Sequence, residues 1–557
     1  MRILVLILVS IPLLAGDLTS RFDLTYNRLL HGGPPHFDAA FVLADAAPQH
    51  TRRFTQFSGD VSGRYIGALA IASQLRGVQV PQLDAIVTEL LRLQKPDGHF
   101  GDPLSTGGTV TTNDMAIMWG NGRLLIGLME YHRVKPRADV LETARKIGDF
   151  LVSVAPLYNS EVVRKEYNGE KFAVGYICWT QHIEGLVALW QSTKENRYLE
   201  LARALAERTD RHPSQHSHGY LTSLRGIMDL YRATGERKYL DQVAREWQSL
   251  VASGNVLPQG AVPEMFAPAI KRDEGCSEAD WLRLSLDLWR ETHEPKYVEQ
   301  AQRTLFNELE MNQFSNGDFG HHPLTGDGIA PPHARAWWCC TMHGLRALAT
   351  VFDSVMMERD GKLWLDVPAD GKGKAGGLRV RVDSSLEQDG SVKLTILATD
   401  GKSHTIAVRQ PEWASAVSGP EFTRVWKQGE TVTIKYEMET RVMRQAKGKA
   451  KAAVFYGPWL LGVDMQATPN YFDEPSSQNR VSLPAGERIT LSSAKDSHFA
   501  HLGVTYLPGG YPMQPQSAVL RPIAEYSHGS DSNRIEWWLP LDGESERLDS
   551  NYTQPRK

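Results

Sequence analysis

A helix-pair pattern that recurs along the first part of the chain constrains the fold most. Three segments share it, and they start at Leu186, Ile227 and Ser285. In each, an apolar stretch ends at an aromatic residue, a polar turn follows, and a Tyr comes eight residues after that aromatic (Trp190 and Tyr198, Tyr231 and Tyr239, Trp289 and Tyr297). A second helix with i, i+3, i+4 apolar spacing then begins. Such pairs cannot bury their apolar faces alone, so we expect them to stack.

Two stacked arrangements are open to such repeats, an open solenoid and a closed toroid. Looser copies of the pattern occupy residues 67–97 and 124–152, and a further helix is predicted over 343–357. The repeats are irregular and long loops separate them, whereas a solenoid built for binding usually keeps its period. Long loops gathered at one end of a ring suit an enzyme pocket. The sequence therefore favours an (α/α)6 toroid over residues 17–358.

The hydrophobic period changes from 3.6 to 2 after Asp360, which is typical of strands. Residues 431–438 alternate polar and apolar side chains. We therefore expect a β-sandwich, jelly-roll-like domain over 359–466. A Pro/Ser/Asn-rich stretch then interrupts the pattern, and a second, smaller all-β segment is expected over 467–557. The predicted fold class is a multidomain α and β chain.

The first residues have the pattern of a signal peptide. Arg2 gives a positive start, residues 3–15 are an apolar run too short to span a membrane, and small residues follow. We expect residues 1–16 to be removed and the chain to be exported, either periplasmic or secreted, with no membrane contact afterwards. With 61 basic and 65 acidic residues the net charge is −4. Nucleic-acid binding needs a basic surface, so that function class is excluded.

The four cysteines are the sharpest chemical feature. Cys339 and Cys340 are adjacent, and Cys276 follows Glu274 by two residues. Neighbouring cysteines rarely pair with each other because a disulfide needs well-placed Cα atoms. Three thiolates and one carboxylate could fill a tetrahedral zinc site. A disulfide from Cys276 to one of the pair and inert buried packing are the alternatives.

Glu264 is a candidate proton donor. It lies in Pro263–Phe266, ten residues before Glu274, in a predicted long loop. Apolar neighbours would raise the pKa of Glu264 and suit a general acid. The alternative is a solvated surface glutamate.

Histidines gather in predicted loops of the helical part. Any one of them is more often a capping or core residue than a ligand. Together they indicate a polar pocket that could hydrogen-bond hydroxyl groups. With the Trp beside the cysteine pair, the candidate substrate-binding residues are His182, His216, His218, His322 and Trp338.

With these features, the chain resembles the beta-L-arabinofuranosidase-type glycoside hydrolases, family 127 and its relatives. The resemblance covers most of the chain beyond the predicted signal peptide. Its most specific part is the combination of Glu-x-Cys with Cys-Cys; the pieces in the β region are weaker. The pieces that carry it are Gln94–Gly98, Tyr231–Gly235, Glu264–Phe266, Glu274–Cys276, Trp338–Cys340, Arg409–Ala414, Tyr456–Pro458 and Leu520–Glu525.

The resemblance implies an (α/α)6 barrel followed by β-sandwich domains. It implies zinc as the cofactor, Cys339 as the nucleophile and Glu264 as the acid/base. His216 and His182 match substrate-binding histidines. The implied metal ligands are Glu274, Cys276, Cys339 and Cys340.

The function expected from the resemblance is that of an exo-acting retaining glycoside hydrolase. It would release β-L-arabinofuranose or a related sugar from plant-type glycans, so a carbohydrate is the expected partner, and a homodimer is compatible with it. Two differences lie beside the expected pocket: Thr341–His343 replace a Pro and an Asn, and the segment between Glu264 and Glu274 is shorter. These two differences affect the expected identity of the sugar more than the expected reaction class. The alternatives are a same-fold hydrolase or lyase acting on another pectic sugar, and a non-catalytic glycan-binding protein with structural zinc.

Overall fold

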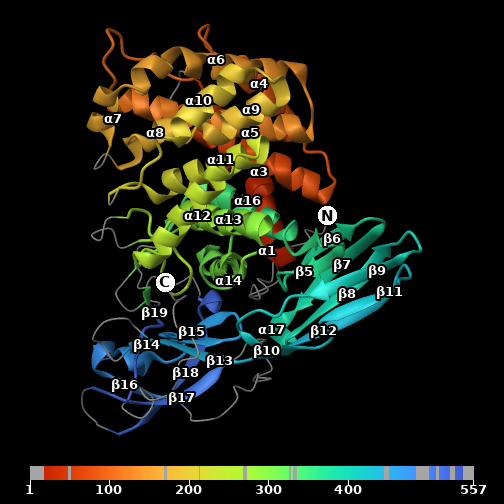
Figure 1. Cartoon of the computed structure of the whole chain (residues 1–557). Helices are drawn as coiled ribbons and strands as arrows, with labels where there is room; N and C mark the ends of the chain where they lie inside the picture. Colours follow the sequence, from red (N-terminus) through yellow and green to blue (C-terminus); the bar gives the residue numbers. More distant parts are fainter. Residues whose placement is uncertain are drawn as a thin grey trace, which may run out of the picture.

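The structure is a computed structural model with a helical N-terminal part and a β-rich C-terminal part (Figure 1). No helix among the described residues is long and apolar enough to cross a membrane. The predicted signal peptide over 1–16 lies outside the described residues. These are 18–47, 52–168, 172–212, 214–266, 272–324, 328–329, 335–444, 451–473, 475–483, 501–509, 514–526 and 534–542.

Six helices contact one another in an order that closes on itself. Each contacts the next, and the last returns to the first. Their side chains are buried over most of the helix surface, as in α13, where every residue from Gly275 to Trp289 is buried. Helices buried all round belong inside a domain. The six are α3 (Asp60–Arg76), α5 (Thr112–Val134), α9 (Ile183–Thr193), α11 (Ser217–Thr234), α13 (Gly275–Thr292) and α16 (Trp338–Phe352).

A second helix packs on each of these six. These partners are amphipathic: in α12 the buried residues are Tyr239, Leu240, Val243, Trp247 and Leu250, which form one stripe at helical spacing. The partners, in the same order, are α4 (Pro81–Leu91), α6 (Ala138–Tyr158), α10 (Asn196–Ala206), α12 (Arg237–Ala252), α14 (Pro295–Arg303) and α1 (Leu18–His31). The predicted helix pairs are confirmed as α9–α10, α11–α12 and α13–α14. Shorter elements connect the pairs: α2 (Ala39–Leu43), α7 (Glu161–Tyr167), α8 (Ile177–Thr180), the π-helical η2 (Thr304–Leu309) and α15 (Glu310–Asn312).

Two mainly antiparallel sheets follow the helices along the chain. One has the strand order β10-β12-β8-β7-β6 and the other β11-β9-β5-β4. Side chains alternate between buried and exposed along β7 and at the end of β12, so the predicted period of 2 is confirmed there. The strands are β4 (Met356–Arg359), β5 (Lys362–Leu365), β6 (Gly371–Ala375), β7 (Leu378–Ser385), β8 (Ser391–Ala398), β9 (Ser403–Val408), β10 (Ala414–Val417), β11 (Glu421–Val425) and β12 (Thr431–Met438).

The last described part of the chain forms a third sheet. Its central strand order is β13-β14-β15-β18-β17-β16. Its first three strands lie before residue 466. They pair with one another, and the third of them, β15, pairs with β18 rather than with the preceding sheets. The change of β unit therefore falls near residue 439 instead of the expected 466, because sequence period does not reveal a strand's partner. The strands are β13 (Thr440–Arg444), β14 (Lys451–Tyr456), β15 (Trp459–Asp464), β16 (Arg480–Ser482), β17 (Leu502–Leu507) and β18 (Gln516–Pro522).

Candidate active site

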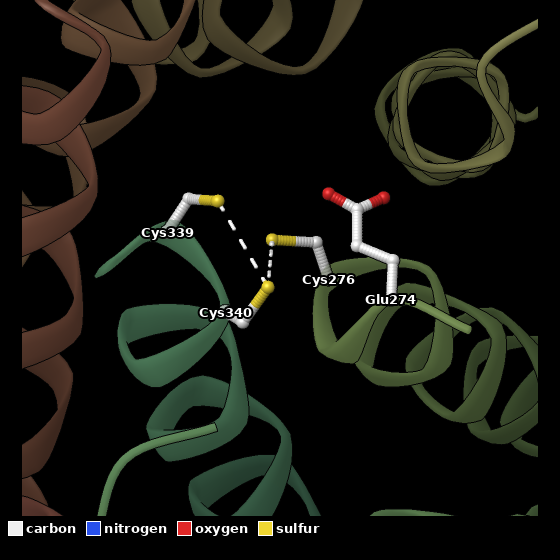
Figure 2. A group of neighbouring side chains, drawn as sticks. All are labelled: Glu274, Cys276, Cys339 and Cys340. Atoms are coloured by element: carbon white, nitrogen blue, oxygen red, sulfur yellow. Dashed lines mark hydrogen bonds between the residues drawn. The ribbon is translucent and has the colours of Figure 1, made fainter. Parts of the chain in front are cut away.

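Three sulfurs and one carboxylate meet where two neighbouring helices begin (Figure 2). Glu274 and Cys276 stand at the start of α13, and Cys339 and Cys340 in the first turn of α16. The Sγ atoms of Cys276 and Cys340 are 3.7 Å apart, and those of Cys339 and Cys340 are 3.9 Å apart. One donor atom from each of the four residues lies within 4.8 Å of the others. The structure thus brings all four predicted ligands together.

Gly275 lets the two helix starts approach so closely. A Cβ atom at this position would lie 2.9 Å from Asn312 Oδ1 and 3.1 Å from Cys340 Cβ. A larger side chain would therefore push α13 away from α16 and separate Cys276 from the cysteine pair.

The donor set fits a zinc ion. With Zn–S bonds of about 2.3 Å, two sulfurs of a tetrahedral site are about 3.8 Å apart, which matches both measured sulfur distances. A disulfide would need about 2.05 Å between sulfurs, and the four cysteines, all of which lie in the described ranges, are free thiols. The structure therefore does not contain the disulfide from Cys276 that was one of the alternatives. Cys178, the fourth cysteine, is fully buried in the hydrophobic core.

The negative charge of the cluster concentrates on one thiol. Hydrogen bonds from Cys276 and Cys340, and then the Arg64 guanidinium, hold the pKa of Cys339 well below its usual value. Burial raises the pKa of Cys276 and of Cys340. Cys339 is also the one member of the four that is only partly buried. The sulfur that most readily carries charge is thus the one that a substrate could reach.

Arg64, on α3, is a site residue that the sequence did not reveal. Its Nη1 atom lies 3.6 Å from Cys276 Sγ, 2.9 Å from His218 Nε2 and 3.0 Å from His343 Nδ1. The Arg64 Nε atom lies 2.7 Å from Asp60 Oδ1, and this ion pair fixes the guanidinium. Arg64 therefore places a buried positive charge directly beside the thiols.

Glu264 is buried, with only 3% of its surface exposed, so it is not the solvated glutamate of the alternative interpretation. Its backbone is held on both sides, because its N–H donates to Arg272 O at 3.1 Å and its carbonyl accepts from Ser217 N at 2.9 Å. The Arg272 guanidinium donates two hydrogen bonds to the carboxylate, one of them from Nη2 to Oε1 at 2.6 Å. Arg272 is a second residue that the sequence did not reveal.

His216 links the two glutamates. Its Nε2 atom lies 3.2 Å from Glu274 Oε2, and the adjacent Ser217 is hydrogen-bonded to the Glu264 backbone. Burial works to lower the pKa of His216, but the Glu274 carboxylate outweighs it and raises the pKa above the usual value. The ring meets Trp119 edge-on at 5.6 Å between centroids. His216 is thus brought into the cluster.

The other predicted histidines are fully buried and held by partners. His218 Nδ1 is 2.8 Å from Asp280 Oδ2, and its Nε2 faces Arg64. His322 Nδ1 is 2.9 Å from Asp273 Oδ2. His182 lies between two backbone carbonyls, Trp179 O at 2.6 Å and Met118 O at 2.9 Å. This placement makes His182 a core residue and gives no support to a role in substrate binding.

An aromatic group stands next to Cys339. Trp338 packs in parallel with Trp337 at 6.0 Å and meets Phe41 edge-on at 5.0 Å. Phe54, which is 36% exposed, meets Trp337 at 5.4 Å. Trp338 was predicted, whereas Phe54 and Trp337 were not, since a lone aromatic residue in a loop is no signal by itself. These rings offer flat apolar faces beside the thiol.

Comparisons with known proteins agree with this geometry. The family model for the beta-L-arabinofuranosidase catalytic domain of glycoside hydrolase family 127 matches residues 22–353. A crystal structure of a family 127 beta-L-arabinofuranosidase from Geobacillus stearothermophilus T6 matches with a TM-score of 0.71 and 14% identity, covering 95% of this chain and 100% of that one. The family 127 beta-arabinofuranosidase BT3674 matches with a TM-score of 0.70 and 16% identity, covering 94% of each chain. No curated protein matches the sequence.

The family model spans more than half of the chain, and the solved structures share the arrangement of a helical part followed by a β-rich part. The chain therefore belongs to glycoside hydrolase family 127 and is a glycoside hydrolase.

Proposed function

We propose that the protein is an exo-acting retaining glycosidase in which Cys339 is the nucleophile and Glu264 the acid/base. The observation that carries this proposal is the state of Cys339: of the clustered thiols it is the partly exposed one and the one whose pKa is held low. A thiolate is the nucleophilic form of cysteine. The closed order of the six helices supports an (α/α)6 toroid around this site.

The metal that we propose for the cluster is zinc. Glu274, Cys276, Cys339 and Cys340 would hold it, since their donor atoms have the chemistry and the spacing of a tetrahedral site. When bound, zinc supplies positive charge that keeps the three sulfurs deprotonated at neutral pH.

In the first proposed step, the Cys339 sulfur attacks the anomeric carbon of the bound sugar. The glycosidic C–O bond breaks, and its electron pair leaves with the departing oxygen. Glu264 gives its proton to that oxygen. The sugar is then joined to Cys339 by a C–S bond with inverted configuration, and Glu264 is a carboxylate.

In the second step, the Glu264 carboxylate takes a proton from a water molecule as the water oxygen attacks the anomeric carbon. The C–S bond breaks and its electron pair returns to Cys339 as the thiolate. Two inversions give net retention, as in retaining glycosidases that use two carboxylates. The ion pair with Arg272 stabilises the carboxylate that this step requires.

The substrate that we propose is a glycan ending in β-L-arabinofuranose or a related sugar. The matching family model and one of the similar solved structures are those of beta-L-arabinofuranosidases, and a second similar structure is that of a beta-arabinofuranosidase. We propose that buried polar groups such as His216 hydrogen-bond sugar hydroxyls and that Trp338 packs on a sugar face, which the burial of His216 and the stacking of Trp338 on Trp337 support. We also propose export of the chain, from the signal-like residues 1–16. The homodimer stays an expectation that light scattering of the purified protein would test.

The decisive experiment compares the wild-type enzyme with Cys339→Ser on aryl β-L-arabinofuranosides, with the zinc content of each sample measured. The wild type should turn over, and its intact mass under rapid quench should include a species heavier by one sugar residue. Cys339→Ser should lose both signals. Cys340→Ser is the matched control: it removes a sulfur of the same cluster without removing the proposed nucleophile.

Two outcomes would contradict the proposal. The nucleophile assignment is wrong if Cys339→Ser keeps its turnover, or if the trapped sugar is attached elsewhere. The proposed sugar is wrong if the wild type cleaves other glycosides but no arabinofuranoside in a panel of furanosides and pyranosides.

A further inference from the structure

A second group of acidic side chains lies beside the cysteine cluster and is not used by the proposed mechanism. Asp273, Glu278 and Glu308 each contribute a carboxylate oxygen, and these atoms lie within 4.8 Å of one another. All three side chains have 0% of their surface exposed. Three carboxyl groups in a dry interior need compensation of their charge, because an isolated buried carboxylate is very costly.

The three acids come from separate elements that meet here. Asp273 directly precedes the cysteine-cluster residue Glu274, Glu278 lies in the first turn of α13, and Glu308 lies in the π-helical η2. A π-helical turn is a rare, widened stretch that is often found at functional sites. Asp273 is already hydrogen-bonded to His322, through the ring Nδ1 at 2.9 Å and the backbone N–H.

The two glutamates have no such partners. Among the described residues, neither carboxyl oxygen of Glu278 and neither of Glu308 has a hydrogen-bond partner. Buried polar atoms in folded proteins are nearly always satisfied, so four unsatisfied oxygens in one spot call for a ligand.

Gln259 gives an independent indication of what is missing. It is fully buried, and within the described part of the chain neither its amide oxygen nor its amide nitrogen has a partner. Its side chain lies close enough to Glu308 to interact with that carboxyl. The turn that carries Gln259 is fixed to η2, because the Thr304 hydroxyl donates to Gly260 O at 2.9 Å. The fold therefore holds an unsatisfied amide against the unsatisfied acids.

We propose that Asp273, Glu278, Glu308 and the Gln259 amide oxygen bind one Ca²⁺ ion. The donors are oxygens only, the set that calcium prefers, and three carboxylates with one amide offer up to about seven of them, within the six to eight that Ca²⁺ takes. Mg²⁺ usually keeps several waters and suits a fully buried site poorly. Zinc favours sulfur ligands such as those of the neighbouring cysteine cluster.

The role of this calcium is structural. It ties the turn at Gln259 and η2 to the segment at Asp273, which leads directly into Glu274 and α13. Asn307, which directly precedes Glu308 on η2, is hydrogen-bonded to β15 of the third sheet. Calcium thus stabilises the junction between the helical part and the third sheet, and it fixes the start of the segment that carries the cysteine cluster.

The test measures metal content and thermal stability. Wild-type protein is produced in millimolar Ca²⁺, passed through calcium-free buffer, and analysed for calcium and zinc by mass spectrometry. We expect about one calcium per chain and a Tm that falls by several degrees when calcium is stripped and recovers when it is restored. Glu278→Gln and Glu308→Gln should lose the calcium and keep the zinc.

Glu310→Gln is the matched control, because Glu310 follows η2 directly but faces Arg21 at 3.7 Å. It should keep the calcium. The proposal is overturned if wild-type protein produced in calcium contains none and its Tm does not respond to the ion. In that case Glu278 and Glu308 share a proton as a carboxyl–carboxylate pair, and Glu308→Gln should be as stable as the wild type. The wild-type measurements decide the matter even if neither glutamate variant folds.

Discussion

At the scale of single residues, the proposed proton transfers depend on the ion pair between Arg272 and Glu264. A general acid has to carry a proton before the first step, whereas a neighbouring guanidinium favours the carboxylate. The Arg272 side chain is 46% exposed, so it can swing away from Glu264 when a sugar enters. The pair therefore suits the second step as it stands and the first step once it opens.

A change at Arg272 tests this interpretation. Arg272→Gln removes the guanidinium that donates two hydrogen bonds to the Glu264 carboxylate, so the carboxylate is held less well for the second step. We expect kcat on an aryl arabinofuranoside with a good leaving group to fall, because hydrolysis of the glycosyl-enzyme slows. Arg237→Gln, an exposed arginine paired with Asp241, should leave kcat unchanged. An unchanged kcat in Arg272→Gln would show that the ion pair has no part in the second step.

Glu264 itself should reveal its role through the leaving group. General acid catalysis is worth roughly 10²–10⁴ in rate, so Glu264→Gln should lose about that factor on substrates with a poor, alkyl leaving group. A dinitrophenyl leaving group needs no proton, so glycosylation of Cys339 should then remain fast. Steady-state and burst kinetics on both substrate types measure this. An equal loss on both would assign Glu264 to binding instead.

Single residues also show how far sequence reasoning reaches. The metal-site candidates could be predicted because cysteines are scarce and their spacing is specific. Arg64 could not, since it lies in an ordinary helix and meets Cys276 across 212 residues of chain. His182 was chosen because it lies near a predicted loop, and the sequence did not reveal that its ring lies between two backbone carbonyls. Side-chain contacts of this kind depend on which helices become neighbours.

At the scale of elements, one turn is built three times. Each of the three clear helix pairs reverses at a residue in the left-handed region: Lys194 at φ 61°, Gly235 at φ 72° and His293 at φ 56°. The preceding Thr donates to the carbonyl four residues back and accepts from the backbone N–H two residues on, as Thr234 does with Leu230 O at 2.8 Å and Glu236 N at 3.2 Å. The repeat seen in the sequence thus reflects a repeated local geometry.

Gly235 is the position where this geometry can be tested cleanly. A Cβ atom there would meet nothing within 4 Å, so only the backbone conformation opposes a side chain. Gly235→Ala should cost about 1 kcal/mol of unfolding free energy, measured by chemical denaturation. His293→Gly, the reverse change in the third turn, should be neutral or stabilising. Equal stability of Gly235→Ala and the wild type would mean that the turn relaxes out of the left-handed region.

Hydrophobic periodicity predicts well those helices and strands whose structure is determined by their own residues. The helix pairs are of this kind, because each partner carries its apolar stripe locally. The π-helical η2 is not, since its widened turn coincides with contacts to residues far away in sequence, such as those of Asn307 with the segment at Pro458. The strands β13–β15 were expected as β structure within residues 359–466, and they join the sheet of β16–β18 because β15 pairs with β18, which periodicity does not reveal.

At the scale of the whole molecule, buried polar contacts add to an apolar cluster, which includes Met311 and Leu460, in joining the helical part to the third sheet. The β2 segment (Gly328–Ile329), between η2 and α16, pairs with β19 (Ile535–Glu536) near the other end of the chain. Asn307 on η2 reaches the β14–β15 turn, where its amide donates to Pro458 O at 3.0 Å and accepts from Leu460 N at 2.6 Å. Order along the sequence predicts separate domains, whereas these contacts indicate that the parts fold together.

Asn307 therefore offers a test of whether the molecule unfolds as one body. Asn307→Ala leaves the buried Pro458 carbonyl and Leu460 N–H without their partner, which at about 1–3 kcal/mol for each group should cost roughly 2–6 kcal/mol. If the parts are coupled, calorimetry should show one transition at a lower Tm, and the zinc that we propose for the cysteine cluster should be released in that same transition. Asn255→Ala, at an exposed turn where the side-chain amide donates to Ser253 Oγ at 2.7 Å, should leave the transition unchanged. Two separated transitions in Asn307→Ala, with zinc kept through the first, would show instead that the third sheet is an independent domain and that the helical part holds its site unaided.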